Sequence, residues 1–136
     1  MRNCADWAGG ISLSTTNVDP RRGELWYVDL EPTIGSEMQK KRPVVVVSSD
    51  VFRKDIPLRT VVPITGWKPV FVGKQYFVHI PHTLSNGLTK DSAAAVLQIR
   101  GVDIQRFDAV TGKIGVLSGT TMDLITAAVA AVIEHQ

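Results

Sequence analysis

The sequence is short of the residues from which disulfide scaffolds and zinc modules are built. Its 136 residues include one cysteine, Cys4, so no disulfide can form within the chain. No cysteines and histidines have the spacing of a zinc site. No apolar run approaches the roughly 20 residues that cross a membrane. These absences exclude a disulfide-stapled secreted domain, a zinc module and a helical membrane protein, and we expect a soluble, cytoplasmic protein.

The chain does have enough apolar sequence for one folded domain. Hydrophobic residues make up 44% of a 14.8-kDa chain, and the mean hydropathy is +0.08. A chain of this size and composition can bury a core and is not intrinsically disordered. We expect one domain at residues 20–136, preceded by a flexible extension at residues 1–19. That extension is rich in Gly, Ser and Thr and lacks the apolar stretch of a signal peptide.

Positive charge is concentrated in the middle of the chain. Residues 40–100 contain ten Lys and Arg against three Asp and Glu, a net charge of +7, whereas the whole chain carries only +2. A block this basic attracts nucleic acid, but a solvated basic surface gives the same count. Composition alone leaves both interpretations open.

Short β-strands dominate the pattern from residue 22 onward. Runs of aromatic, β-branched or alternating apolar residues predict strands, and they lie at 24–30, 43–47, 60–65, 75–80 and 93–100. The unbroken valines at 44–47 are typical of a strand buried on both faces. Pro63 lacks an N–H group, so its strand must have an edge or a bulge there. If residues 93–100 form one strand, Gln98 and Arg100 share a face at its end.

A clear helix is predicted at the C-terminus. Ser118 can cap its start, and Met122, Ile125, Val129 and Val132 recur at helical spacing. Several short strands followed by one helix predict a mainly β fold, either a small barrel or two packed sheets.

The common catalytic patterns are missing. The chain has no phosphate-binding glycine loop and no local serine, cysteine or histidine nucleophile signature. No histidine pair has metal-ligand spacing on a helix and the carboxylates are scattered, so we expect neither a cofactor nor a metal. What remains is Gly35-Ser36-Glu37, followed by Lys40-Lys41-Arg42-Pro43 just before the valine strand.

This loop brings one carboxylate and three cations to the end of a rigid strand. The planar guanidinium of Arg42 can hold two oxygens of a phosphate. If Thr65, at the end of another strand, converges with Arg42, the pair can stabilise the charge of a phosphodiester transition state. Each residue also has an ordinary explanation, with Glu37 in a surface ion pair and Thr65 bonded to backbone groups.

The same residues resemble the MazF/PemK/Kid family of toxin endoribonucleases. The resemblance rests on motifs in sequence order: Arg22 to Leu30 with Pro32-Thr33 and Gly35-Ser36-Glu37, Arg42 to Val46, Val62 to Thr65, Gly87 to Ser92, Gln98-Ile99-Arg100, and a closing segment with Asp103, Arg106, Ile114-Gly115 and Leu117-Ser118. It covers the chain from about Arg21 to the final helix. Each motif is weak alone, whereas the ordered set is specific.

The resemblance implies an SH3-like barrel of the MazF, PemK and CcdB type, a symmetric homodimer, and sequence-specific, metal-independent cleavage of single-stranded RNA. It also implies a cognate antitoxin, and an acidic, partly disordered tail suits a basic groove. Arg42 and Thr65 match the family's catalytic pair, with Glu37 assisting. The residues then expected to contact RNA are Ser36, Lys40, Lys41, Gln98 and Arg100.

Two departures from the family pattern limit this resemblance. Many relatives carry a Gly-Gly pair where this chain has Gln39-Lys40, so their RNA motif cannot be transferred. The Kid branch has a histidine in place of Ser36, and an arginine and an aspartate in place of Ala95 and Leu97. A mechanism that uses those side chains cannot operate here.

The general base is not fixed by the resemblance. Cleavage through the 2′-hydroxyl needs a base for that proton and an acid for the departing 5′-oxygen, and neither Arg42 nor Thr65 is a base at neutral pH. Glu37 is the only carboxylate of the set, so we expect it to be the base, although neighbouring cations weaken a carboxylate in that role. His79 and His82 are the alternatives.

Single-stranded RNA suits the sequence better than duplex DNA, because the clear helix has no basic residues to enter a groove. Trp67, Phe71 and Tyr76 flank Lys68 and Lys74 of the segment 66–75, and we expect this segment to form a mobile wall of an RNA groove. Two other functions remain open: a CcdB-like toxin that binds gyrase without nuclease activity, and a non-catalytic RNA-binding barrel.

Overall fold

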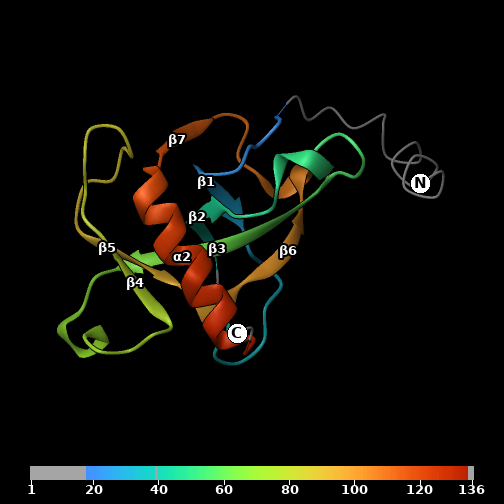
Figure 1. Cartoon of the computed structure of the whole chain (residues 1–136). Coiled ribbons are helices and arrows are strands. Elements are labelled where there is room, and N and C mark those ends of the chain that lie inside the picture. Colours follow the sequence, from blue (N-terminus) through green and yellow to red (C-terminus); the bar gives the residue numbers. More distant parts are fainter. Residues whose placement is uncertain (1–17, 39, 135–136) are drawn as a thin grey trace.

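The computed structural model describes residues 18–38 and 40–134 of the chain. Short strands, single 3-10 turns and one long C-terminal helix make up this part (Figure 1). The elements are β1 (Glu24–Asp29), β2 (Lys41–Val46), η1 (Asp50–Phe52), β3 (Leu58–Gly66), η2 (Pro69–Phe71), β4 (Phe77–Ile80), β5 (Ser92–Ala95), η3 (Val96–Gln98), β6 (Arg100–Asp103), η4 (Ile104–Arg106), β7 (Lys113–Val116) and α2 (Gly119–Val132).

The strands form one curved antiparallel sheet. Its order is β4-β5-β3-β2-β1-β7, and β6 pairs with β3 beside this path. Within the described residues β4 and β7 stand at the two ends of the path and do not pair, so the barrel is open on that side. The prediction of a mainly β, barrel-like fold with a C-terminal helix is confirmed.

Strand β3 is shared between two partners on one edge. Its first half pairs with β6 from Leu58 to Val61, and its second half pairs with β5 from Ile64 to Gly66. Pro63 lies in the gap between the two partners, where a missing N–H group costs no ladder bond. The prediction of one strand at 93–100 is wrong, because η3 turns the chain from β5 to β6 at this gap.

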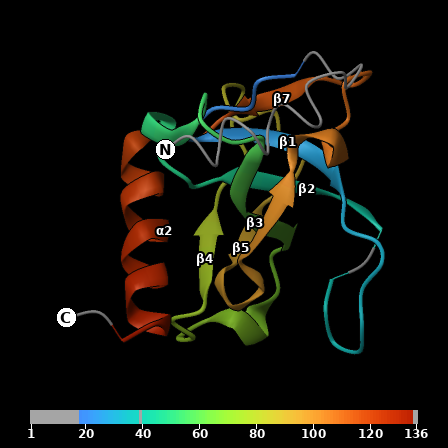
Figure 2. The ribbon, with the colours of Figure 1, turned by 90° about the vertical axis from the view of Figure 1, so that its right-hand side faces the viewer.

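Two clusters of buried side chains cover the two faces of the sheet. Val45, Val62 and Ile64 belong to a cluster that packs against α2, which lies alone along one flank of the sheet (Figure 2). Val44 and Val46 belong to the second cluster, on the other face. All three valines of β2 are fully buried, which confirms the strand predicted to be buried on both faces.

Helix α2 has the cap and the apolar stripe that its sequence predicts. Ser118 accepts a hydrogen bond from the backbone N–H of Thr121 at 3.2 Å, and Met122 and Ile125 are buried against the sheet. Because the helix supplies one wall of the first cluster, its burial stabilises the sheet as well as the helix.

The first described residues are held to the domain by a buried arginine. The side chain of Arg59 is 4% exposed, its Nε donates to the carbonyl of Pro20 at 2.8 Å, and its Nη2 lies 3.1 Å from Asp19. Burial lowers the pKa of the Arg59 guanidinium, and the carboxylate of Asp19 opposes that shift. Val18 also packs on the second cluster, and the rest of the predicted extension, residues 1–17, lies outside the described residues.

In the described residues no helix is both long and apolar enough to cross a bilayer.

A tight turn before β5 packs directly on the backbone of β7. Asn86 is 4% exposed, its amide donates to the carbonyl of Pro81 at 2.9 Å, and its Oδ1 accepts from the N–H of Leu88 at 3.0 Å. A methyl group on Gly87 would stand 2.3 Å from the carbonyl oxygen of Ile114, and one on Gly115 would stand 2.3 Å from the carbonyl carbon of Asn86. Two glycines therefore let the turn and the strand touch.

We expect Gly87→Ala to lower the free energy of unfolding by several times more than Gly73→Ala. Both glycines have positive φ angles, +69° and +80°, so each alanine costs about 1 kcal/mol for its backbone alone. A methyl on Gly73 meets no atom within 4 Å, whereas a methyl on Gly87 collides with β7. Urea unfolding of the two variants measures the difference, and equal losses would show that the turn does not press on β7.

Candidate functional site

Arg42 and Thr65 line the same cavity. It has a volume of about 280 Å³ and lies where β2 and β3 meet the loop that precedes β5. We call it the arginine cavity. Its rim also includes Tyr27 of β1 and Lys90 of that loop. The sequence did not show whether Arg42 and Thr65 lie close together, and the structure places both at this cavity.

The register of β2 and β3 accounts for this convergence. The ladder pairs Val44 with Pro63, and continuing it by two residues sets Arg42 opposite Thr65. Side chains two residues apart along a strand share a face, so the register that packs the valines also sets the positions of these two polar residues.

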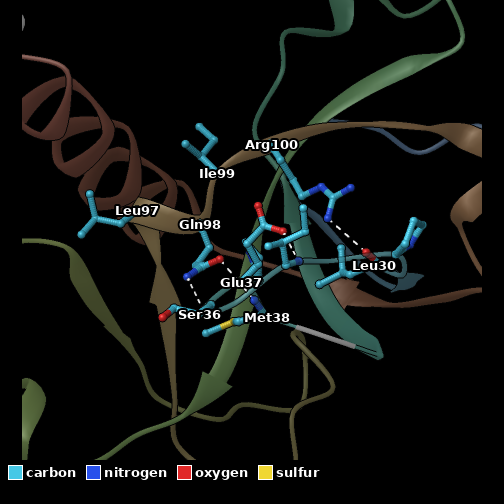
Figure 3. Close-up of a pocket in the computed structure, with 11 residues that line it drawn as sticks. Leu30, Ser36, Glu37, Met38, Leu97, Gln98, Ile99 and Arg100 are labelled. Carbon is cyan, nitrogen blue, oxygen red and sulfur yellow. Dashed lines mark hydrogen bonds between the residues drawn. The ribbon is translucent and has the colours of Figure 1, made fainter.

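A second cavity, of about 530 Å³, lies between the β1–β2 loop and η3. We call it the loop cavity. Glu37 and Ser36 enter it from the loop, and Gln98 and Arg100 enter it from η3 and the start of β6 (Figure 3). Pro63 lines the loop cavity and Thr65 lines the arginine cavity, so the two cavities adjoin along β3.

Glu37 lies in the loop cavity and is not among the described residues that line the arginine cavity. Its Oε1 accepts a hydrogen bond from the N–H of Ile34 at 2.7 Å, which closes a turn within the loop. The described geometry thus brings Arg42 and Thr65 together but sets Glu37 beside them in the neighbouring cavity.

Gln98 and Arg100 hold the β1–β2 loop from the opposite wall. The Oε1 of Gln98 accepts from the N–H of Met38, and its Nε2 donates to the carbonyl of Ser36, both at 3.3 Å (Figure 3). Nη1 of Arg100 donates to the carbonyl of Leu30 at 3.1 Å. Some of the side-chain donors and acceptors of Gln98 and Arg100, which we expected to contact RNA, are therefore already bonded to the loop.

Lys40 is in the left-handed region, with a φ of +67°. Its N–H donates to Oε1 of Glu31 at 3.0 Å, and its carbonyl accepts from the N–H of Leu30 at 3.1 Å. A lysine in this conformation is strained, whereas glycine adopts it without cost. Lys40 belongs to Gln39-Lys40, the pair at which the sequence departs from the expected family pattern.

Lys41 is paired with an acid. Its ammonium lies 3.2 Å from Oδ2 of Asp108, a carboxylate that also accepts from the hydroxyl of Thr111 at 2.6 Å and from the N–H of Val110 at 3.0 Å. Mainly through the bonds from Thr111, with Lys41 contributing, the pKa of Asp108 is lowered to about 2.

His79 and His82 share one carboxylate. Nδ1 of His82 is 2.7 Å from Oδ1 of Asp91, and Nε2 of His79 is 3.6 Å from Oδ2. The hydrogen bond from His82 is the main cause that lowers the pKa of Asp91. Neither histidine is among the described residues lining the arginine cavity, although Lys90 and Ser92, on either side of Asp91, do line it.

The aromatic residues of the predicted groove wall pack on one another. The rings of Trp67 and Phe71 are 5.7 Å apart and edge-on, Phe71 stacks on Phe77 at 3.7 Å, and Trp67 lies 4.5 Å from the ring of His79. Their mobility stays a prediction. In the part of the chain that is described, no three His, Cys, Asp or Glu side chains gather as metal ligands would.

Lys90 lines the arginine cavity but was not among the site residues expected from the sequence. The turn signal at residues 85–87 predicted a loop, but it does not show that Gly87 packs on Ile114 of β7, far away in the sequence. No local pattern at residue 90 carries that information.

We expect Lys40→Gly to raise the free energy of unfolding by about 0.5–1 kcal/mol, because it removes left-handed strain. Lys68→Gly removes the same charge at an exposed residue with a φ of −133°. Glycine there relieves no strain and only raises the conformational entropy of the unfolded chain, so the free energy of unfolding should fall. Urea unfolding of both variants tests the sign. A loss of stability in Lys40→Gly would contradict the assigned conformation.

We expect Asp108 to make the free energy of unfolding depend on pH in the acidic range. Because its pKa is lowered from 3.8 to about 2, the ionised carboxylate stabilises the fold fully above pH 3.8, and this contribution is lost as the pH falls through about 2. We expect Asp108→Asn to have a shallower dependence of unfolding free energy on pH between 4 and 2. Asp123→Asn, on the exposed face of α2, serves as the control, and the same slope in both variants would contradict this assignment.

The sequence and the fold both match known toxins. Residues 21–133 match the family described as "PemK-like, MazF-like toxin of type II toxin-antitoxin system". Endoribonuclease MazF9 of Mycobacterium tuberculosis is 35% identical over 109 residues, covering 76% of this chain and 89% of that protein. Endoribonuclease EndoA of Bacillus subtilis is 32% identical over 113 residues, covering 77% and 86%.

Solved structures with the same fold come from the same group. The crystal structure of MazF from Deinococcus radiodurans superposes with a TM-score of 0.72 at 18% identity, covering 87% of this chain and 99% of that one. An endoribonuclease in complex with its cognate antitoxin, from a mycobacterial species, superposes with a TM-score of 0.65 at 17% identity, covering 86% and 97%. The expected family is confirmed: this chain belongs to the PemK-like, MazF-like toxins of type II toxin–antitoxin systems.

Proposed function

We propose that this toxin is an endoribonuclease that cleaves single-stranded mRNA at specific sequences, without a metal, by attack of the 2′-hydroxyl. The observation that carries the proposal is the arginine cavity, in which Arg42 and Thr65 face one small space. The family membership of the chain and the names of its curated relatives agree with this activity.

In the proposed reaction the scissile phosphate occupies the arginine cavity. The ribose 2′-oxygen attacks phosphorus and loses its proton to a base, the bond to the 5′-oxygen breaks, and that oxygen gains a proton. The products are a 2′,3′-cyclic phosphate and a 5′-hydroxyl. Arg42 neutralises the charge that builds on the phosphoryl oxygens, and Thr65 orients the phosphate or the attacking oxygen.

The rest of the RNA strand extends along β3 into the loop cavity. The two cavities adjoin, because Thr65 and Pro63 lie two residues apart, about 7 Å along a strand. Glu37, which lines the loop cavity beside the arginine cavity, is the proposed base. The proposed contacts to RNA are Ser36, Lys40, Lys41, Gln98 and Arg100.

The proposed partners are a second copy of the chain and a cognate antitoxin. MazF of Deinococcus radiodurans has been solved with MazE, in structures that superpose on this chain with TM-scores of 0.66 and 0.67. We expect an antitoxin with an acidic, partly disordered tail, because the central part of this chain carries a net charge of +7.

Purified toxin incubated with labelled single-stranded RNA and EDTA should yield fragments that end in a 2′,3′-cyclic phosphate. Arg42→Ala and Thr65→Val should each lower kcat/KM by about 100-fold or more, because each removes a group that meets the transition state. Uncut RNA together with stalled gyrase would favour a CcdB-like toxin. Bound but uncut RNA would favour a non-catalytic RNA-binding barrel.

The base is identified by pH–rate profiles of three variants. If Glu37 takes the proton of the 2′-hydroxyl, Glu37→Gln should lose the acidic limb of the pH–rate profile and most of kcat. His79→Ala and His82→Ala should keep the acidic limb and kcat. A Glu37→Gln enzyme with an unchanged profile would remove Glu37 from the mechanism. Loss of the limb in a histidine variant instead would assign the base to the cluster around Asp91.

A further inference from the structure

Lys90 supplies a second cation to the arginine cavity. Arg42 enters from β2 and Lys90 from the loop before β5, and no Asp or Glu is among the described residues that line the cavity. The loop cavity, by contrast, contains Glu37 as well as Arg100. Of the two, the arginine cavity is therefore the one whose charge favours an anion.

The position of the ammonium follows from Gly66. A methyl group on Gly66 would lie 3.3 Å from Nζ of Lys90, so the ammonium lies over the residue that follows Thr65. Within residues 18–38 and 40–134 it has no ion-pair partner, unlike Lys41 with Asp108 and Lys113 with Glu24. Its charge is therefore available to a ligand beside Thr65.

The backbone that carries Lys90 is fixed to the sheet. The hydroxyl of Ser92, a residue only 4% exposed, donates to the carbonyl of Lys90 at 3.0 Å, and the N–H of Trp67 donates to the carbonyl of Asp91 at 3.1 Å. On its other side the loop is held by the contact of Gly87 with β7. The backbone at Lys90 is therefore already in position before a ligand binds, and only the side chain remains to be ordered.

We propose that Lys90 contacts a non-bridging oxygen of the RNA phosphate that the arginine cavity holds, opposite Arg42. This rests on the proposed ribonuclease function and adds a residue to it. The charge on the phosphoryl oxygens rises from one to two in the phosphorane, and two cations on opposite walls stabilise that increase more than one does. Thr65, between them, then needs only to orient the reacting group.

The test compares Lys90→Met and Lys90→Arg with Lys54→Met, which removes the same charge at an exposed residue near η1. We expect Lys90→Met to lower kcat/KM on a single-stranded RNA about 10- to 100-fold, as for a lost charge-assisted hydrogen bond. Lys90→Arg should recover part of the loss, and Lys54→Met should cleave like the wild type. Thermal unfolding should show the same midpoint for all of them.

A binding measurement separates a phosphate contact from a structural role. With an uncleavable strand that has a 2′-deoxyribose at the scissile position, the slope of log Kd against log salt should fall by about 0.7 in Lys90→Met and not in Lys54→Met. Equal slopes and equal kcat/KM in these two variants would overturn the role of Lys90 alone. If the wild type itself cuts no RNA, the proposed function fails first.

Discussion

The pairing of β2 with β3 is the constraint on which the rest of the structure depends. Val44 and Val46 pack into one cluster and Val45 into the other, and all three are fully buried. A slip of one residue would move each valine to the opposite face, which neither cluster could accommodate. The register is therefore fixed by packing, and its continuation brings Arg42 and Thr65 to one cavity. Geometry at the site is set by core side chains that never meet a ligand.

The division of β3 at Pro63 separates the two cavities. Since β5 and β6 take different halves of β3, the chain between them must turn, and η3 is that turn. Gln98 is thereby directed to the β1–β2 loop, which it holds through Ser36 and Met38. The two cavities lie on either side of this division, and among the described residues the charged groups that line the arginine cavity are cations, whereas the loop cavity also has Glu37.

Much of this could be predicted from local patterns, and the exceptions have physical causes. The valine run and the stripe on α2 report burial directly, so those elements were predicted within a residue or two. The strand at 93–100 was wrong, because its break is imposed by a partner strand distant in sequence. Glu37 lines the loop cavity rather than the arginine cavity and accepts a hydrogen bond from Ile34 inside its loop, an arrangement that residue spacing does not predict. Lys90 depends on a backbone contact between Gly87 and β7 and is equally invisible in the sequence.

The close contact between the turn at Asn86 and β7 couples the far edge of the sheet to the spacing of two charges. Lys90 belongs to a loop that packs on β7. Arg42 belongs to β2, which is separated from β7 by β1 in the sheet. We expect a substitution that loosens β7 to shift the loop that carries Lys90, and with it the position of the ammonium relative to the guanidinium of Arg42. Residues of β7 that touch neither Arg42 nor Lys90 can therefore influence the site through the backbone alone.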